Sequence, residues 1–255
     1  MKSCIIMFSK DKNNVILREN INKGGYGVYV HESIMYLEKG NESIPIIPTE
    51  DIKVSLNGKL VYNIENAMAA CAAAIGLNID YSVIKEGLKS FYCDTSFNPG
   101  RFNIYDLNGV KVVLDYGHNV EGYKAVIKAV KNFKYKRLVG IIGVPGDRSD
   151  ESVEKIGRIA GRNFDYIYIK EDKDKRGRRS GAIASILKKG IINTGFSTKK
   201  VETILNEKMA LERAINTAKE GDFIIIFFEE MESLIKLLQN KLDEINKKLN
   251  SIAMI

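Results

Sequence analysis

The segment GVKVVLDYGHNVEG (residues 109–122) contains an apolar strand, the polar end of that strand and the start of a helix. The run from Val110 to Leu114 has the character of a buried strand, and Asn119 is a suitable residue to begin a helix. Asp115 ends the apolar run, and His118, one of two histidines in the chain, follows closely. Such a strand end indicates either an ordinary loop or one part of a binding site.

The sequence on both sides of this segment predicts an α/β fold. Residues 101–116 read as a hairpin, because Asn108-Gly109 is the preferred pair for a two-residue turn. Further along, apolar strands alternate with amphipathic helices. We predict strands at 137–143, 165–170 and 222–228, and helices near 120–132, 150–163, 180–189 and 207–219. This alternation is typical of a mostly parallel, Rossmann-like sheet covered on both faces.

In such a sheet, ligands bind outside the carboxyl ends of the strands. Three polar segments directly follow predicted strands: Asp115–Asn119, Gly143–Asp150 and Lys170–Arg179. We therefore expect all three segments to lie along one edge of the sheet and to form the ligand site there.

The N-terminal part has a different pattern. Residues 1 to about 50 read as short β elements, with a hairpin around His31-Glu32 and an edge strand in SIPIIP (43–48). An alanine-rich helix follows at 63–77, and a second helix runs from its N-cap Asp80 to Phe91. The segment DTSFNPGR (94–101) reads as a linker. We therefore expect three parts, 1–97, 98–229 and an amphipathic C-terminal helix at 230–255.

The C-terminal helix has a seam of apolar residues at alternating spacings of four and three, which continues for three heptads. Either the seam packs on the helix's own domain, or it mediates self-association or binding of a partner chain. The seam residues are Met231, Ile235, Leu238, Leu242, Ile245, Leu249 and Ile252.

Composition excludes several classes of protein. The chain has 255 residues and a net charge of +7, but no recognition motif or aromatic-studded basic face, so we expect no nucleic-acid partner. No apolar run is long enough for a membrane helix, and the N-terminus does not resemble a signal peptide. We expect a cytoplasmic protein without a membrane partner. The three cysteines do not have the spacing of a metal site.

Six motifs, taken together and in this order, resemble the last part of the cyanophycin synthetase family. The second half of that family is a Mur-ligase-like, ATP-dependent amide ligase. The resemblance covers most of residues 15–228, and it implies that 1–97 correspond to the end of the Mur central domain and 98–229 to the Mur C-terminal domain. The motifs are NIENAMAACAAA (63–74), NPGRFNI (98–104), LDYGHN (114–119), GVPGDRSDE (143–151), GRIAGRNFDYIYIKEDKDKRGR (157–178) and GDFIIIFFE (221–229).

The sequence departs from the family at one important point. The family has a phosphate loop of the G-x-x-x-x-G-K-[ST] type and carboxylates for Mg²⁺, whereas NKGGYGVYV (22–30) lacks the Gly-Lys-Ser/Thr ending. The ATP-grasp half is absent too. We therefore expect a C-terminal piece or a natural truncation, in which ATP and Mg²⁺ require the missing part of the site. The alternatives are a non-catalytic subunit whose partner chain supplies the phosphate loop, and an unrelated nucleotide-binding enzyme such as a dehydrogenase. The lack of a G-x-G-x-x-G motif argues against the last.

The resemblance implies nucleotide contacts for five residues. Asn63 and Asn66 would hold adenine, Arg101 the phosphates and Asp115 the ribose, while Asn119 completes the Asp115 motif. Two family positions differ, since Tyr62 replaces the usual His and Gly117 the usual Ala. The residues alone allow simpler interpretations. Asn63 and Asn119 suit helix N-caps, Arg101 a surface position, and His118 a loop histidine with a backbone partner.

The resemblance also implies a reaction and a substrate. ATP would phosphorylate an aspartate side chain of a polyaspartate backbone, and the amine of arginine would then displace phosphate from the acyl phosphate. The implied catalytic residues are Arg101, His118, Asp147 and Arg148, with Arg148 also orienting a carboxylate. Glu171, Asp172 and Asp174 would bind the guanidinium of arginine, and Arg176 and Arg178 its α-carboxylate. The simpler interpretations are an Asp147–Arg148 ion pair and a solvated charged loop.

Overall fold

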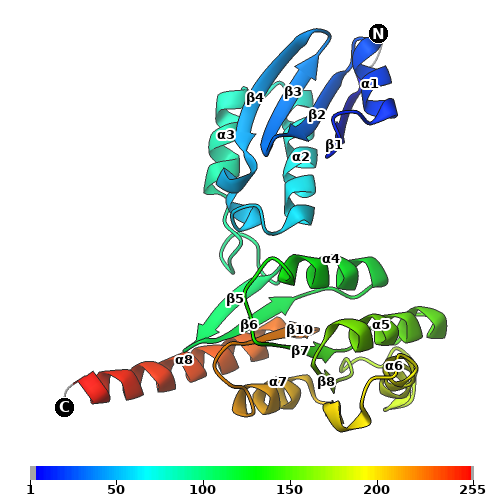
Figure 1. Ribbon diagram of the computed structural model, residues 1–255, viewed down its shortest axis with the longest axis vertical. Helices are drawn as coiled ribbons and strands as arrows, with labels where there is room; N and C mark the ends of the chain where they lie inside the picture. Colours follow the sequence, from blue (N-terminus) through cyan, green and yellow to red (C-terminus); the bar gives the residue numbers. More distant parts are fainter. Residues whose placement is uncertain (1–3, 254–255) are drawn as a thin grey trace. The chain divides into compact units, whose positions relative to one another are not determined.

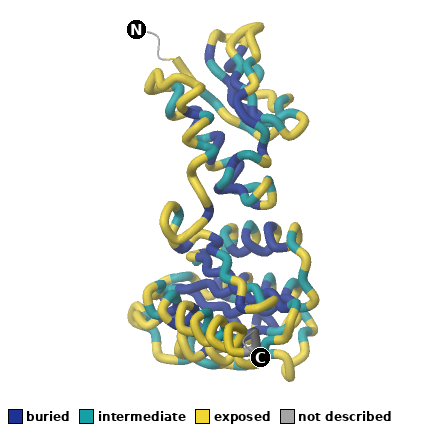
Figure 2. Tube along the Cα trace, turned by 90° about the vertical axis from the view of Figure 1, so that its left-hand side faces the viewer, coloured by how far each residue is buried: buried dark blue, intermediate teal, exposed yellow. Residues whose placement is uncertain are grey.

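The computed structural model describes residues 4–253, and the chain divides between Asn98 and Pro99 into two compact units. The division lies within the predicted linker 94–101. We call the two parts the N-terminal and C-terminal units and describe each by itself (Figure 1). Figure 2 shows that buried residues in each unit concentrate in the strands and in the helix faces that cover them.

The N-terminal unit contains a four-stranded sheet. Its strands lie in the order β1 (Ile6–Ser9), β2 (Tyr26–His31), β3 (Ile34–Lys39) and β4 (Glu42–Pro48). Strands β2, β3 and β4 are antiparallel, which confirms the predicted hairpin and the proline-containing edge strand. Strand β1 pairs with β2 in parallel.

The prediction that the first 50 residues contain only β elements was wrong. Helix α1 (Val15–Asn22) connects β1 to β2, as a parallel pair requires. The side chain of Asn14 caps it by accepting a hydrogen bond from Leu17 N at 3.1 Å. Leu17 and Ile21 then pack closely over Gly27, where a side chain would collide with them. The N-cap signal was present in the sequence, but the helix is only eight residues long.

Two further helices complete this unit, α2 (Val61–Gly76) and α3 (Tyr81–Ser90), after the short 3₁₀ helices Thr49–Asp51 and Lys53–Ser55. Asp80 caps α3 as predicted, accepting from Ser82 N at 2.8 Å. Met7 packs against the α1 side, whereas Ile6 lies against Gly76 of α2. Because successive strand residues point to opposite faces, α1 and α2 cover opposite faces of the sheet.

The C-terminal unit has the predicted, largely parallel α/β sheet. The strands lie in the order β5-β6-β10-β7-β8-β9, and only β5 runs antiparallel to its neighbour. Asn108 and Gly109 form the β5–β6 turn with φ values of 54° and 87°. The three-residue strand β9 was not predicted, because it is too short to show a pattern. The bounds are β5 Asn103–Leu107, β6 Val110–Asp115, β7 Arg137–Ile142, β8 Tyr166–Ile169, β9 Val201–Thr203 and β10 Asp222–Phe227.

Helices cover both faces of this sheet (Figure 1). Helices α4 (Val120–Val130), α5 (Asp150–Asn163) and α6 (Ala182–Ile192) form one layer, and α7 (Glu207–Asn216) and α8 (Met231–Ala253) form the other. The parallel registers align the carboxyl ends of β6, β10, β7 and β8 at one edge. We call this the carboxyl edge.

Helix α8 uses its apolar seam on its own unit. Leu238 of the seam is buried in the core beneath the sheet, and the other seam residues contact that core as far as Ile245. Leu234 and Leu237, which the predicted seam did not include, are buried in the same core. Leu249 is 49% exposed, and the side chain of Ile252 lies outside the described residues. The segment from Met231 to Ile245 therefore shares a core with the preceding sheet. Within residues 4–253, none of the helices is both long enough and apolar enough to cross a membrane.

Candidate functional site

Asp115 ends β6 and is almost completely buried, with 4% exposure. One carboxylate oxygen accepts a hydrogen bond from Gly117 N at 2.7 Å and the other accepts one from Phe102 N at 3.1 Å. Burial raises the pKa of Asp115 to about 6, although these two N–H groups and the charge of Arg101 act in the opposite direction. The carboxylate therefore joins the chain around Phe102 to the end of β6.

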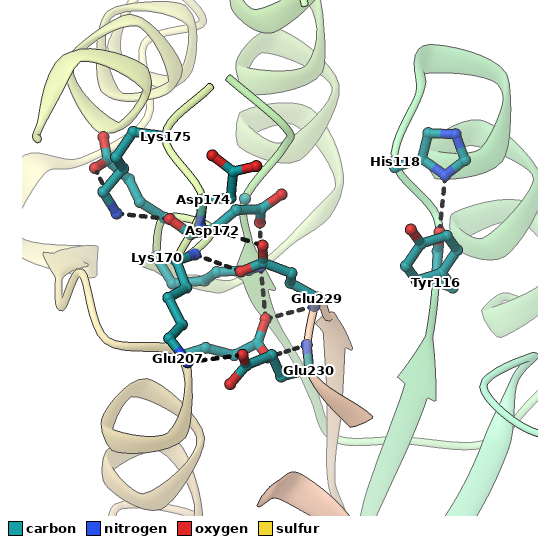
Figure 3. A network of polar contacts seen from close by, with 12 residues as sticks. Tyr116, His118, Lys170, Asp172, Asp174, Lys175, Glu207, Glu229 and Glu230 are labelled. Carbon is teal, nitrogen blue, oxygen red and sulfur yellow. Dashed lines mark hydrogen bonds and ion pairs between the residues drawn. The ribbon is translucent and has the colours of Figure 1, made fainter. Parts of the chain in front are cut away.

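An aromatic and cationic cluster adjoins Asp115. The guanidinium of Arg101 lies over the ring of Tyr116, 5.6 Å from its centroid. The rings of Tyr116 and His118 are 5.3 Å apart, and His118 Nδ1 lies 3.1 Å from the carbonyl oxygen of Tyr116, which can only accept (Figure 3). His118 thus has the backbone partner expected of a loop histidine. The structure brings Arg101, Asp115 and His118 together at the end of β6.

Asn119 begins α4 as an N-cap, and its side-chain oxygen accepts from Gly122 N at 2.8 Å. This cap orients the next turn, where Tyr123 is fully buried and stacks on Phe227 of β10 with centroids 3.6 Å apart. Tyr123 Oη donates to the carbonyl oxygen of Gly143 at 2.8 Å. Burial raises its pKa well above the usual value. The sequence interpretation missed Tyr123, although its position one turn after the cap was a usable signal.

The loop after β7 and the loop after β8 are tied together by arginines. Arg178 donates from Nε to Gly146 O at 2.6 Å and from Nη2 to Arg148 O at 2.7 Å. It also pairs with Asp150 at 2.6 Å. Gly146 has no room for a side chain, since a Cβ there would lie 2.1 Å from the carbonyl oxygen of Lys175. The guanidinium of Arg178 is therefore engaged in holding the two loops in contact.

Asp147 and Arg148 are not paired only with each other. Asp147 forms its close ion pair with Arg176, which lowers the pKa of the Asp147 carboxyl. Arg148 Nη1 is farther from Asp147, at 3.9 Å. Among the described residues, Arg148 Nε is buried and has no hydrogen-bond partner. A buried guanidinium N–H without a partner favours an anionic ligand at this position.

All three predicted acidic ligands have partners within the chain, and two of them are buried. Glu171 is buried and accepts hydrogen bonds from Gly181 N at 2.9 Å and Ala184 N at 3.0 Å, so it caps α6. Burial alone would raise the pKa of Glu171, but these N–H groups and Lys175 outweigh it and lower the pKa. Asp172 is also buried and forms an ion pair with Lys170. Asp174 is exposed and accepts from Arg176 N at 2.9 Å.

Two further residues belong to the carboxyl edge. Lys170 lies in the predicted edge segment Lys170–Arg179 but was given no role, and Glu207 was not predicted. Lys170 directly follows β8, and its side chain is 1% exposed. Its ammonium lies 2.6 Å from Glu207 Oε2 at the start of α7 (Figure 3). A polar pocket of about 440 Å³ lies beside this pair. Its lining includes Lys173, Lys175, Glu207, Glu229 and Glu230.

Asn63 and Asn66 belong to the N-terminal unit. They line an apolar pocket of about 540 Å³ between α2 and α3. Asn63 is buried within α2 and donates to Val54 O at 2.7 Å, so its interpretation as an N-cap was wrong. Asn66 donates to Asn63 Oδ1 at 3.2 Å and is exposed. The amide of Asn63 therefore supports that of Asn66 at the surface of the pocket.

The residues that the structure describes do not fit a metal ion. No group of three or more His, Cys, Asp or Glu side chains within residues 4–253 is arranged to hold one.

Comparison with known proteins shows which proteins the chain resembles. The family model for the Mur ligase glutamate ligase domain matches residues 100–227. Cyanophycin synthetase of Geminocystis herdmanii is 35% identical over 239 residues, covering 94% of this chain and 27% of the relative. The chain therefore spans about a quarter of the length of this curated relative.

Solved Mur ligases have the same fold at low sequence identity. MurF from Acinetobacter baumannii superposes with a TM-score of 0.60 and 19% identity, covering 96% of this chain and 52% of that one. MurF ligase from Thermotoga maritima in complex with ADP gives a TM-score of 0.54 and 16% identity, covering 95% and 55%. At these identities, the likeness establishes the fold alone.

Proposed function

This chain belongs to the Mur ligase family, and from that membership we propose that it is the amino-acid-adding module of an ATP-dependent amide ligase. The observation that carries the proposal is the buried Nε of Arg148 at the carboxyl edge, which has no partner among residues 4–253. Ligands of open α/β sheets bind at this edge. A guanidinium donor without a partner suits a substrate carboxylate or the phosphoryl group formed on it.

We propose the reaction of the cyanophycin synthetase relatives, in which arginine is joined to aspartate side chains of a polyaspartate backbone. A carboxylate oxygen of aspartate attacks the γ-phosphorus of ATP, ADP leaves, and an acyl phosphate forms. The amine nitrogen of arginine then attacks the acyl carbon, phosphate leaves and the amide forms. In such a reaction the protein contributes mainly positioning and stabilisation of negative charge. Arg101 and Arg148 are the proposed cationic residues.

The structure suggests a division of roles among the predicted substrate ligands. Arg178 donates from three nitrogens to the loop after β7, so we propose that it shapes the site and that Arg148 meets the carboxylate. Arg176 and Asp147 form an exposed pair that a charged ligand can separate. The pocket beside Glu229 and Glu230 offers carboxylates to the guanidinium of arginine.

We also propose that adenine contacts Asn66 in the N-terminal unit. The α2–α3 pocket presents apolar walls, and an amide can both donate to and accept from a purine edge. Each carboxylate oxygen of Asp115 accepts one backbone hydrogen bond and can accept a second one, from a ribose hydroxyl. We retain this contact as a prediction.

Titration calorimetry with L-arginine tests the amino-acid site. We expect the purified chain to bind arginine, and Arg148→Gln to weaken binding about tenfold or more, since one charge-assisted contact is worth roughly 1.5–3 kcal/mol. Arg179→Gln is the matched control, because Arg179 is an exposed arginine of the neighbouring loop. Equal affinities of the wild type and Arg148→Gln would refute the role of Arg148.

A second candidate is a non-catalytic binding subunit, which supports amide formation only together with a partner chain. In either case a G-x-x-x-x-G-K-[ST] loop would have to come from outside residues 1–255. One assay separates the two candidate functions. The chain is incubated with ATP, Mg²⁺, arginine and a polyaspartate primer, and the release of phosphate is measured. Arginine-dependent release by the chain alone would exclude the requirement for a partner.

A further inference from the structure

Lys170 places a positive charge in the interior of the C-terminal unit. The residue has no exposed surface, and its ammonium lies 2.7 Å from Asp172 Oδ1 and 2.6 Å from Glu207 Oε2 (Figure 3). A buried ammonium is strongly unfavourable unless it is closely paired, and here two carboxylates from different segments pair it. Asp172 lies in the loop after β8, whereas Glu207 begins α7.

Glu207 transmits this contact to the chain that follows β10. Its Oε2 accepts a hydrogen bond from Glu229 N at 2.7 Å, and its Oε1 accepts one from Glu230 N at 3.0 Å. The carboxylate of Glu229 accepts in turn from the backbone N–H groups of Lys173 and Asp174, which follow Asp172. The contacts thus form a closed ring that returns to the loop after β8.

The path of the Lys170 side chain depends on Gly143 at the end of β7. A Cβ at Gly143 would lie 2.6 Å from Lys170 Cε and 2.7 Å from its Cδ. The carbonyl oxygen of Gly143 also accepts from Tyr123 Oη. The lysine stem therefore crosses the end of β7 in a space left open for it, and the ammonium reaches the segments beyond.

The polar pocket of about 440 Å³ is lined from three segments. Lys173 and Lys175 line it from the loop after β8, Glu207 from the start of α7, and Glu229 and Glu230 from the chain just before α8. Lys170 does not line the pocket, so it can affect a ligand only by positioning the residues that do.

We infer that Lys170 is a positioning residue, whose ammonium sets the separation between the β8–α6 loop and the β10–α8 junction and thereby the shape of the amino-acid site. The ligand part of this inference rests on the proposed function, whereas the coupling of the two segments is a property of the fold. A buried ion pair is weak evidence for added stability, so a role in fixing one geometry accounts better for its position.

The test compares Lys170→Met, which removes the charge, with Lys170→Arg, which retains it. Arg137→Met is the matched control, because Arg137 pairs with buried Asp222 at the amino end of the same sheet, Nε to Oδ1 at 3.1 Å. Amide hydrogen exchange reports on Glu229 and Glu230, and titration calorimetry measures the affinity for L-arginine.

We expect Lys170→Met to speed exchange at the Glu229 and Glu230 amides by about tenfold or more, with exchange in α5 unchanged. Its Kd for arginine should rise about tenfold, and Lys170→Arg should restore both properties to within a few-fold of wild type. Arg137→Met should lower the melting temperature without changing the exchange of these two amides or the Kd for arginine. Should Lys170→Met not fold, Asp172→Asn serves instead, because it keeps an oxygen for the Lys170 ammonium but loses the charge, and it leaves both Glu207 acceptors in place.

Unchanged exchange at Glu229 and Glu230 in Lys170→Met or Asp172→Asn would overturn the inference. An equal loss of arginine affinity in Arg137→Met would also overturn it, because the effect would then follow stability alone. If the wild type itself does not bind arginine, the proposed amino-acid site fails, and the exchange result still decides whether Lys170 couples the two segments.

Discussion

Arg178 Nε donates a hydrogen bond to the carbonyl oxygen of Gly146 at 2.6 Å, and this contact joins the loop after β8 to the loop after β7. The two residues are 32 positions apart in the sequence. Two more donors of the same guanidinium reach Arg148 O and Asp150. A planar guanidinium can make these contacts together, whereas an ammonium cannot hold the same geometry. The relationship makes Arg178 a residue of loop structure at the carboxyl edge.

Replacement of Arg178 by Lys should therefore loosen both loops. We expect the free energy of unfolding to fall by about 1–2 kcal/mol, because hydrogen bonds to charged groups are lost at a partly buried position. Urea denaturation measures the change, and Arg179→Lys, at an exposed neighbouring position, is the control. If the two variants are equally stable, the contacts of Arg178 with the loop after β7 contribute nothing in solution.

Asp115 should make stability depend on pH. Its pKa is raised from 3.8 to about 6 in the folded chain, so the native state binds the extra proton between these values. The protonated Asp115 carboxyl therefore adds to the free energy of unfolding at pH 4, and this contribution is lost as the pH rises through about 6. A shift of about two pKa units corresponds to a change on the order of 3 kcal/mol.

Asp115→Asn removes this titration, so the difference in unfolding free energy between wild type and variant should fall between pH 4 and pH 7. Urea denaturation at a series of pH values measures it. A difference that stays constant across this range would show that Asp115 titrates normally. Calorimetry with ATP on the same two proteins tests the ribose contact, and equal affinities would argue against it.

The two asparagines of α2 should separate a structural role from a binding role. Asn63→Ala leaves the buried carbonyl of Val54 without its donor, so we expect a loss of about 1–3 kcal/mol. Asn66→Ala should change stability by less than about 0.5 kcal/mol, because the residue is exposed. Hydrogen exchange of the backbone amides in α2 measures the change in stability of each variant.

If adenine contacts Asn66, the Asn66→Ala variant should also bind ATP more weakly, despite its unchanged stability. Titration calorimetry with ATP measures this. Normal ATP affinity in Asn66→Ala would remove the proposed adenine contact, and a large loss of stability in that variant would contradict the exposed position of the side chain.

Along the α8 seam, stability should depend on position. Leu238 is completely buried in the core, so Leu238→Ala should lower the free energy of unfolding by about 2–5 kcal/mol. Leu249 is 49% exposed, so Leu249→Ala should have an effect below about 0.5 kcal/mol. Sedimentation of both variants measures their state of assembly, which should change if the end of the helix binds a second chain. A large effect of Leu249→Ala, with a change in assembly, would indicate self-association through the seam.

Much of the fold was predictable because it depends on local patterns. The Asn108-Gly109 pair adopts the positive φ angles that the β5–β6 turn needs, and the apolar runs before Asp115 and Lys170 end where the strands end. Alternating strands and helices predicted a mostly parallel sheet, and such a sheet brings the ends of its strands to one edge. The position of the candidate site followed from this geometry, before the role of any residue was considered.

The partners of the charged residues were not predictable in the same way. Glu171 caps α6, Arg178 holds a neighbouring loop and Lys170 reaches Glu207, and none of these pairings follows from sequence spacing. A charged run such as KEDKDKRGRR has many possible pairings of similar energy, and the packing of the strands selects among them. Arg148 differs, because packing buries its Nε without supplying a partner among the described residues.

The sequence by itself determined the fold class, the hairpin turn, the helix caps at Asn119 and Asp80, and the candidate edge of the sheet. Each depends on the conformational preference of a few neighbouring residues or on a simple period. The tertiary structure decided the insertion of β10 between β6 and β7, the packing of the α8 seam and the ring of contacts around Lys170. These features join segments distant in sequence, and their free energy arises only when the whole sheet has assembled.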